Sequence, residues 1–188
     1  MTFVTAPNFE NPIDSDEDNT YSITVTVTDG LLENTQDITI TVLGVNETPV
    51  ITSDDSFNFN ENTTSAVTTV TSSDQDDGDS ATYSISGGVD ASHFAINENT
   101  GELTFVNPPD YEIPTDSNTD NTYIVTVTVT DGGGQIDSQD ITITVTNINE
   151  APVITGGSTA TIHVNENSTS AVTTVTSEDV DYGDSATY

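Results

Sequence analysis

The strongest constraint on the fold is an internal repeat with a period of about 103 residues. The segment YSITVTVTDG at residues 21–30 returns as YIVTVTVTDG at residues 123–132. The longer segment NENTTSAVTTVTSSD at residues 60–74 returns as NENSTSAVTTVTSED at residues 165–179. A fixed period of this length is the signature of tandem units that share one fold.

Two similar linkers indicate where one unit ends and the next begins. GVNETPVIT occupies residues 44–52 and NINEAPVIT occupies residues 147–155, each after a run of alternating Thr and aliphatic residues. We interpret Asn-Glu-x-Pro as the boundary between units. Residues 1–47 then form the C-terminal half of a repeat, residues 48–150 a complete repeat, and residues 151–188 the N-terminal part of a further repeat.

The complete unit has the pattern of a β-sandwich. Val, Ile or an aromatic residue alternates with Thr or Ser in short segments, which places one set of side chains inward and the other toward solvent. Gly and Pro residues separate these segments as turns. We predict an all-β protein of tandem immunoglobulin-like Greek-key β-sandwiches, with about seven strands per complete repeat. The predicted strands are residues 57–60, 65–72, 81–86, 93–97, 102–106, 122–130 and 139–146.

Composition excludes several classes of partner. The 188 residues include 32 Asp or Glu but no Lys, Arg or Cys, so the formal net charge is −32. Binding to nucleic acid or to an anionic membrane surface needs basic side chains. No apolar stretch approaches the roughly 20 residues of a membrane span, so this segment is not expected to insert directly into a membrane. A disordered polyacid is the alternative, but strict alternation favours folded β structure.

The carboxylates gather in loops rather than along the strands. Like charges at this density cost stability, and the chain has no basic side chain to offset them. A hard divalent cation would do so, since calcium takes 6–8 oxygens from carboxylates, amides and carbonyls. The alternative is an acidic surface that serves only solubility. The acidic loops are residues 14–19, 73–79, 109–112, 116–120, 148–150 and 178–184.

Five motifs of the complete unit resemble, in order, those of a known family. They are NEN at residues 60–62, SDQD at 73–76, FVNPPDYE at 105–112, VTDG at 129–132 and TNINEAP at 146–152. They are similar to an acidic motif after the first strand, D-x-D, L-D-x-E, A-x-D-x-G and D-x-N-D-x-x-P. The unit thus resembles a cadherin-type repeat, in the form found in tandem in large bacterial surface proteins.

The resemblance implies calcium ions at the junctions between successive repeats, where they stiffen the linker. At the first junction the matching residues are Glu10, Asn46, Glu47, Asp74, Asp76 and Asp131. At the second junction they are Glu61, Asp110, Glu112, Asn147, Asn149, Glu150, Asp179 and Asp181.

The linkers depart from the family pattern at several positions. Gly44 and Asn147 stand where the family has an acid, and Glu150 stands in place of Asp. Residues 1–47 have no counterpart of Glu61. We therefore predict that the first junction binds calcium more weakly than the second.

The resemblance implies a secreted or cell-surface adhesin segment that acts as a calcium-stiffened stalk. Its partners would be the neighbouring repeats of the same chain. An alternative is that the repeat itself binds carbohydrate or a like repeat on another cell, and a third is an accessory repeat of a secreted enzyme. The segment itself is not expected to be an enzyme. Asp74 and Asp76 could in principle act as an acid–base pair, but the chain has no Trp for a sugar platform, and His93 and His163 have no second ligand nearby.

The two partial repeats cannot close a sandwich by themselves. Residues 1–47 hold the counterparts of the last three strands, and residues 151–188 those of the first two or three. Each piece should expose apolar strand faces and unpaired edges. We therefore expect a segment cut from a longer array, whose ends pair head to tail between molecules if they pair at all.

Overall fold

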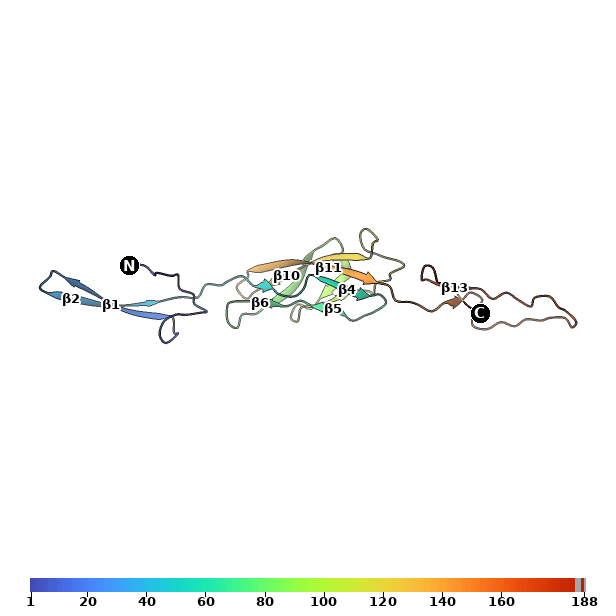
Figure 1. Ribbon diagram of the computed structural model, residues 1–188, viewed down its shortest axis with the longest axis horizontal. Coiled ribbons are helices and arrows are strands. Elements are labelled where there is room, and N and C mark those ends of the chain that lie inside the picture. Colours follow the sequence, from blue (N-terminus) through green and yellow to red (C-terminus); the bar gives the residue numbers. More distant parts are fainter. Residues whose placement is uncertain (185–186, 188) are drawn as a thin grey trace.

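The computed structural model describes residues 1–184 and residue 187. The last positions of the predicted third repeat, 185, 186 and 188, lie outside the described residues. Figure 1 shows an elongated molecule with a β-sandwich at its centre. A hairpin extends from one end of this sandwich, and a long arm that contains β13 (Ser177–Glu178) extends from the other.

The larger sheet of the central sandwich has the strand order β4-β11-β10-β7. Strand β4 runs parallel to β11, and the other pairs are antiparallel. The parallel pair means that the chain returns to the first strand by a long connection, as in a Greek key. The strands are β4 (Ser56–Asn60), β7 (Thr82–Gly87), β10 (Thr122–Thr130) and β11 (Ile136–Thr146).

The second layer is a sheet of three strands in the order β5-β9-β8. It is built from β5 (Ala66–Thr69), β8 (Phe94–Ile96) and β9 (Glu102–Phe105). Two short strands, β3 (Val50–Ile51) and β6 (Ser72–Ser73), pair beside it. The single turn η1 (Ala91–His93) is the helix found in the described part of the chain. The predicted all-β sandwich is confirmed.

Each of the seven predicted strands overlaps a strand of the structure. The largest difference is that β11 begins at Ile136 instead of Gln139. The predicted segment 65–72 is divided, because pairing stops after Thr69 and β6 begins at Ser72. The turn before β9 depends on Gly101, which has a positive φ and lies against the Val70 carbonyl where a Cβ would clash.

Alternation along the strands produces the core. The inward residues of β10 and β11 are fully buried, while their Thr neighbours are more exposed. Rings from β9, β8 and β4 pack on Tyr123 and on each other; the Phe105 and Tyr123 rings lie 5.2 Å apart in an edge contact. Core members are Phe59, Val70, Phe94, Leu103, Tyr123, Val125, Val127, Ile141, Ile143 and Val145.

The N-terminal partial repeat forms a hairpin of β1 (Thr20–Thr28) and β2 (Glu33–Thr41). Its register, from Thr20 opposite Thr41, is that of β10 and β11, where Thr122 lies opposite Thr144. Residues 1–4, which match the end of β9 in sequence, form no strand. The counterpart of β9 has no neighbouring strand with which to pair.

Among its described residues, the C-terminal partial repeat forms the short strands β12 (Val153–Ile154) and β13, which pair antiparallel. These are the counterparts of β3 and β6. Residues 161–165 and 171–174, the counterparts of β4 and β5, form no strand in the structure. In the central repeat β4 pairs with β11 and β5 pairs with β9, and no counterpart of β9 or β11 lies among residues 151–184.

Candidate metal centre

Carboxylates from both sides of the first linker converge. Glu10 lies in the N-terminal partial repeat, Glu47 in the linker, and Asp76 in the loop after β6; one carboxylate oxygen of each lies within 4.8 Å of the others. Asp74, Asp76 and Asp79 form a second group by the same measure. Two repeats thus contribute carboxylate oxygens to one small volume.

Backbone hydrogen bonds hold the linker against this loop. The Glu47 amide donates to Oδ2 of Asp76 at 2.8 Å, and the Asp76 amide donates to Oδ1 of Asp74 at 2.9 Å. The D-x-D spacing therefore folds the loop on itself and leaves the second carboxylate facing the linker.

Asp131 joins the first junction from the turn after β10. It accepts from Nδ2 of Asn46 at 2.8 Å and from the Gln135 amide at 2.7 Å. Gln135 in turn donates its side-chain amide to the Asn46 carbonyl. A Cβ on Gly133 would overlap the Asn46 side chain, so a larger residue at this position would displace the Asn46 amide from Asp131.

Glu61 is the structural centre of the second junction. It is only 1% exposed, yet both oxygens are paired: Oε1 accepts from the Ile148 amide and Oε2 from the Tyr111 amide, each at 2.8 Å. Its carboxylate lies within 4.8 Å of Asp110 and Glu112. A residue at the end of β4 thereby ties the loop after β9 to the linker.

The second linker repeats the geometry of the first. Glu112, Glu150 and Asp181 form a group within 4.8 Å. The Glu150 amide donates to Oδ2 of Asp181 at 2.7 Å, and the Asp181 amide donates to Oδ1 of Asp179 at 3.1 Å. These bonds match those of Glu47, Asp76 and Asp74.

The two Asn residues of this linker, Asn147 and Asn149, donate hydrogen bonds to different kinds of acceptor. Nδ2 of Asn147 donates to Glu112 at 2.8 Å and to Asp181 at 3.0 Å, so a neutral amide bridges two carboxylates of different repeats. Nδ2 of Asn149 donates to the Glu150 carbonyl at 2.9 Å. Among the described residues, no carboxylate is hydrogen-bonded to Asn149 as Asp131 is to Asn46 at the first junction.

Crowding of like charges changes the acidity of these groups. Burial, and then the charge of Glu10 and the neighbouring Asp residues, raises the pKa of Glu47 above its ordinary value. Burial and the charge of Glu61 raise the pKa of Glu112 and of Glu150 in the same way. Each junction therefore resists full ionisation.

Asp131 shows the opposite shift. Burial acts to raise its pKa, but the hydrogen bond from Asn46 and the backbone amides of Gln135, Gly134 and Gly133 hold that pKa below its ordinary value. At the first junction, the ionised form of Asp131 is therefore favoured, whereas that of Glu47 is disfavoured.

The donor set fits a hard cation. Oε2 of Glu47, Oδ2 of Asp74 and Oε2 of Glu150 are buried without a hydrogen-bond partner among the described residues. Such oxygens are costly unless something pairs with them, and the chain contains no Lys or Arg. Calcium accepts carboxylate, amide and carbonyl oxygens in flexible geometry, whereas Mg²⁺ demands near-octahedral sites.

Sequence reasoning missed three residues of the junctions. Asp79 completes the group with Asp74 and Asp76, Gln135 positions Asn46, and Asn62 donates to Oε1 of Glu150 at 2.7 Å. Asp79 lies in the predicted acidic loop at residues 73–79, but outside its D-x-D motif. Asn62 ends the NEN motif but was not among the predicted ligands, and Gln135 lies outside all five motifs. Only contacts distant in sequence identify the roles of these two residues.

Comparison with known proteins points to one family. Residues 55–146 match the family model described as Cadherin domain. Protocadherin gamma-B4 of Homo sapiens and that of Pan troglodytes are each 31% identical over 136 residues, which covers 68% of this chain and 14% of the relative. The chain thus spans a small fraction of the length of these relatives.

Solved structures agree on the fold. The protocadherin GammaB4 extracellular domain matches with 24% identity and a TM-score of 0.56, over 92% of this chain and 28% of that chain. The protocadherin gammaB7 EC3-6 cis-dimer structure matches with 22% identity and a TM-score of 0.58, over 92% and 46%. Drosophila N-cadherin EC1-4 matches with 17% identity and a TM-score of 0.56, over 92% and 44%.

These findings confirm the predicted cadherin-like fold and a secreted or cell-surface location. Within the residues that the structure describes, no helix has the length and apolar character to cross a membrane. The central sandwich is therefore cadherin-like, since residues 55–146 match the Cadherin domain model and the chain shares its fold with protocadherin extracellular domains.

Proposed function

We propose that this chain is a calcium-stiffened spacer within an extracellular adhesion protein. Calcium would bind at the two junctions, held by the residues predicted from the family motifs, and would convert flexible linkers into rigid connections. Asp79 would assist at the first junction. The bacterial setting of such a stalk is a separate part of the proposal that rests on motif resemblance, since the relatives reported above are vertebrate proteins.

The observation that carries the proposal is that one acidic group at each junction spans the linker. Glu10 and Asp76 belong to different repeats but share a group with Glu47, and Glu112 and Asp181 do the same at the second junction. An ion bound there would be lost if the repeats moved apart. Bending the linker would therefore cost the free energy of calcium binding.

A spacer is favoured over a recognition module by the surface of the central repeat. Of its Phe and Tyr residues, all of which the structure describes, only Tyr111 is exposed, at 38%. Interface hot spots are enriched in aromatic residues and Arg, and the chain has no Arg. Homophilic or carbohydrate binding by this repeat therefore has less support.

Calcium addition to chelated protein tests the proposal. The melting temperature should rise, since a ligand that binds only the folded state stabilises it by mass action. Small-angle scattering should show a longer and less flexible particle, and Mg²⁺ should have a smaller effect than Ca²⁺. Identical melting and scattering curves in EDTA and in Ca²⁺ would reject a calcium-dependent spacer.

A further inference from the structure

We propose that Asn121 and its counterpart Asn19 are positioning residues for the acidic loops of the two junctions. Neither Asn is among the predicted calcium ligands. Each holds, through a hydrogen bond to the backbone, the loop that presents a junction carboxylate, Glu112 at the second junction and Glu10 at the first. This inference rests on the calcium function proposed above and adds residues that act through the ligands.

Asn121 contacts the acidic loop of the central repeat directly. Its Nδ2 donates to the Tyr111 carbonyl at 2.9 Å, and the Tyr111 amide donates to Oε2 of Glu61 at 2.8 Å. The peptide units on both sides of Tyr111 are therefore hydrogen-bonded, and because peptide units are planar, these bonds restrict backbone rotation at Tyr111. The side chains on either side of it, Asp110 and Glu112, are the two that form an acidic group with Glu61.

The backbone of Asn121 is itself held in place. Its φ is 63°, in the left-handed region where Asn is enriched among residues other than Gly. Its amide donates to Oδ1 of Asp116 at 3.2 Å, and Asp116 is only 3% exposed. Its carbonyl accepts from the Val145 amide at 2.8 Å, near the end of β11. Asn121 therefore links the acidic loop to the strand that leads into the second linker.

A second buried carboxylate anchors the loop that carries Asn121. Asp90 is 2% exposed, and its two oxygens accept from the Ser117 amide at 2.7 Å and from the Ile124 amide at 2.9 Å. Ser117 lies in the loop and Ile124 in β10. Asp90 thus ties the loop to the core strand that follows it, so the position from which Asn121 reaches Tyr111 is set by the sandwich.

The N-terminal partial repeat has the same contact. Nδ2 of Asn19 donates to the Phe9 carbonyl at 2.8 Å, and the φ of Asn19 is 64°. The Val42 amide donates to the Asn19 carbonyl at 3.0 Å. Phe9 directly precedes Glu10, as Tyr111 directly precedes the junction carboxylate of the central repeat. Both junctions therefore have an Asn that is bonded to the peptide unit before the junction Glu.

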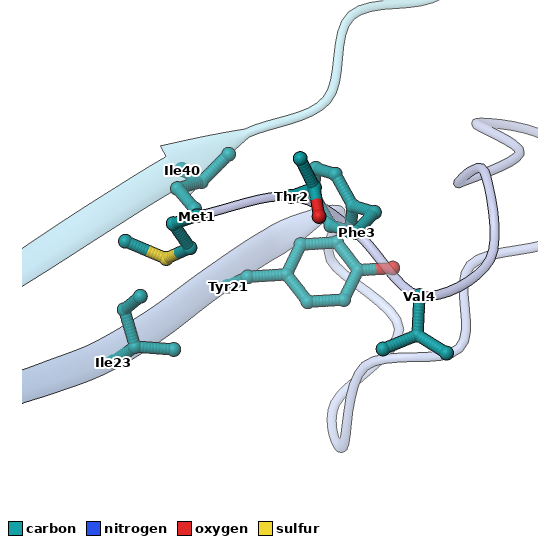
Figure 2. A pocket seen from close by; sticks show the side chains of 7 residues that line it. All are labelled: Met1, Thr2, Phe3, Val4, Tyr21, Ile23 and Ile40. Atoms are coloured by element: carbon teal, nitrogen blue, oxygen red, sulfur yellow. The ribbon is translucent and has the colours of Figure 1, made fainter.

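The strand that follows each Asn starts in the same way. Tyr21 and Tyr123 are the second residues of β1 and β10. Figure 2 shows the Tyr21 ring beside Phe3, and these rings meet edge to face at 5.4 Å, as those of Tyr123 and Phe105 do at 5.2 Å. The two Asn residues thus occupy the same place relative to the packed rings.

The other atom of each amide explains why an Asn stands at this position. Oδ1 of Asn19 and Oδ1 of Asn121 are buried without a hydrogen-bond partner among the described residues. A buried polar atom without a partner costs stability, and glycine would adopt the same backbone without that cost. The bond that Nδ2 donates to the acidic loop is what the Asn side chain adds.

Glycine substitution tests the role, because Gly keeps the positive φ and removes the amide. Asn121→Gly should weaken calcium binding at the second junction by about tenfold or more, as loss of groups that orient metal ligands does elsewhere, and should spare the first junction. Asn19→Gly should do the reverse. Thr119→Gly is the matched control and should bind calcium like the unsubstituted chain, since Thr119 lies in the same loop with a φ of 59° and its hydroxyl donates to the Asn118 carbonyl.

Calcium titration of the intact chain, followed by NMR at the Glu47 and Ile148 amides, resolves the two junctions. Both amides donate to carboxylates of the acidic groups, one at each junction. A second readout needs no metal. In EDTA, the Tyr111 amide should exchange faster in Asn121→Gly than in Thr119→Gly, because the loop is released. Equal exchange in these two variants would overturn the proposal.

A double-mutant cycle distinguishes positioning from a general loss of stability. If Asn121 acts through Glu112, then Asn121→Gly should cost little further affinity once Glu112→Gln has removed the charge of that ligand. Fully additive losses would overturn the proposal, and so would an Asn121→Gly chain that binds calcium as tightly as the control. If Asn121→Gly unfolds the central repeat, Asn19→Gly decides, since its hairpin lies outside the central sandwich.

The same titration separates this inference from the function on which it rests. An unsubstituted chain that binds no calcium would reject the proposed function and the positioning role with it. An unsubstituted chain that binds calcium, beside glycine variants that bind it equally well, would reject the positioning role alone.

Discussion

The octapeptide SAVTTVTS occurs at residues 65–72 and again at residues 170–177, with different structures. In the complete repeat it forms β5, which pairs with β9, and Val70 is 1% exposed. In the arm it is unpaired up to β13, and Val175 is 47% exposed. Identical residues thus form a core strand or an exposed segment according to whether a neighbouring sheet edge is present.

The two copies of the hairpin, β1–β2 and β10–β11, differ less in structure than the two copies of the octapeptide. β1 and β2 pair in the register of β10 and β11, although Val27 is 67% exposed and its counterpart Val129 is fully buried. A hairpin forms from contacts that are close in sequence, so it persists without the second sheet. Strand β5 depends on a partner more than thirty residues away, and it is lost when that partner is absent.

Completing the third repeat should have the largest effect on this comparison. A chain extended after residue 188 by a copy of residues 84–150 would supply the edges that the arm lacks. Amide exchange at Val172 and Val175 should then slow by several orders of magnitude, toward that of Val67 and Val70, because protection follows the stability of the folded unit. Exchange measured at low protein concentration, where copies do not pair, checks this. Continued fast exchange would show that the octapeptide copies differ for another reason.

Matched core substitutions should have different effects on the unfolding free energy in the β10–β11 and β1–β2 hairpins. Ile141→Ala removes a fully buried side chain of β11 and should lower the unfolding free energy of the central repeat by about 2–5 kcal/mol. The counterpart Ile38→Ala, in the half-sandwich, should leave that transition unchanged. Urea denaturation measures both. Equal losses would mean that the N-terminal hairpin and the central repeat unfold as one unit.

Calcium titration compares the two junctions. Asp179→Ala with Asp181→Ala should weaken the tighter sites by at least about tenfold, as removal of ligands and of their hydrogen-bonded support does elsewhere. Asp74→Ala with Asp76→Ala is the matched pair at the first junction and should affect only the weaker sites. Calorimetric titration measures the calcium affinity of each junction in the two double variants. Tighter binding at the first junction than at the second would show that Asp79 and Asp131 more than compensate for the missing carboxylate at Gly44.

The smallest effect expected is a dependence of junction stability on pH. The folded-state pKa values of Glu47, Glu112 and Glu150 are raised above the ordinary value of 4.5. The folded state therefore binds more protons in the window above 4.5, and stability without metal should fall as pH rises through that window. With calcium the trend should reverse, since protons compete with the metal for the carboxylates. Thermal melts in EDTA and in Ca²⁺ across this window test both signs, and parallel trends would argue against metal binding by these groups.

Much of the candidate site was predictable because its residues lie in short motifs at a fixed period. The pairing of Glu47 with Asp76, and of Glu150 with Asp181, agrees with what the resemblance of the linker and loop motifs to the cadherin pattern implied. Gln135 was not predictable, because its role depends on the β10–β11 turn reaching Asn46 across the linker. No sequence pattern indicates that the β10–β11 turn lies close to Asn46.

The sequence by itself determined the period, the alternation of apolar and Thr residues, the turn positions and the acidic loops. These features depend on neighbours along the chain, so they are the same in each copy. The tertiary structure decided which copies become strands, which valines are buried and which carboxylates share a volume. These outcomes depend on pairing between distant segments: backbone groups of a strand need a partner edge, and an apolar face is buried only against a second sheet.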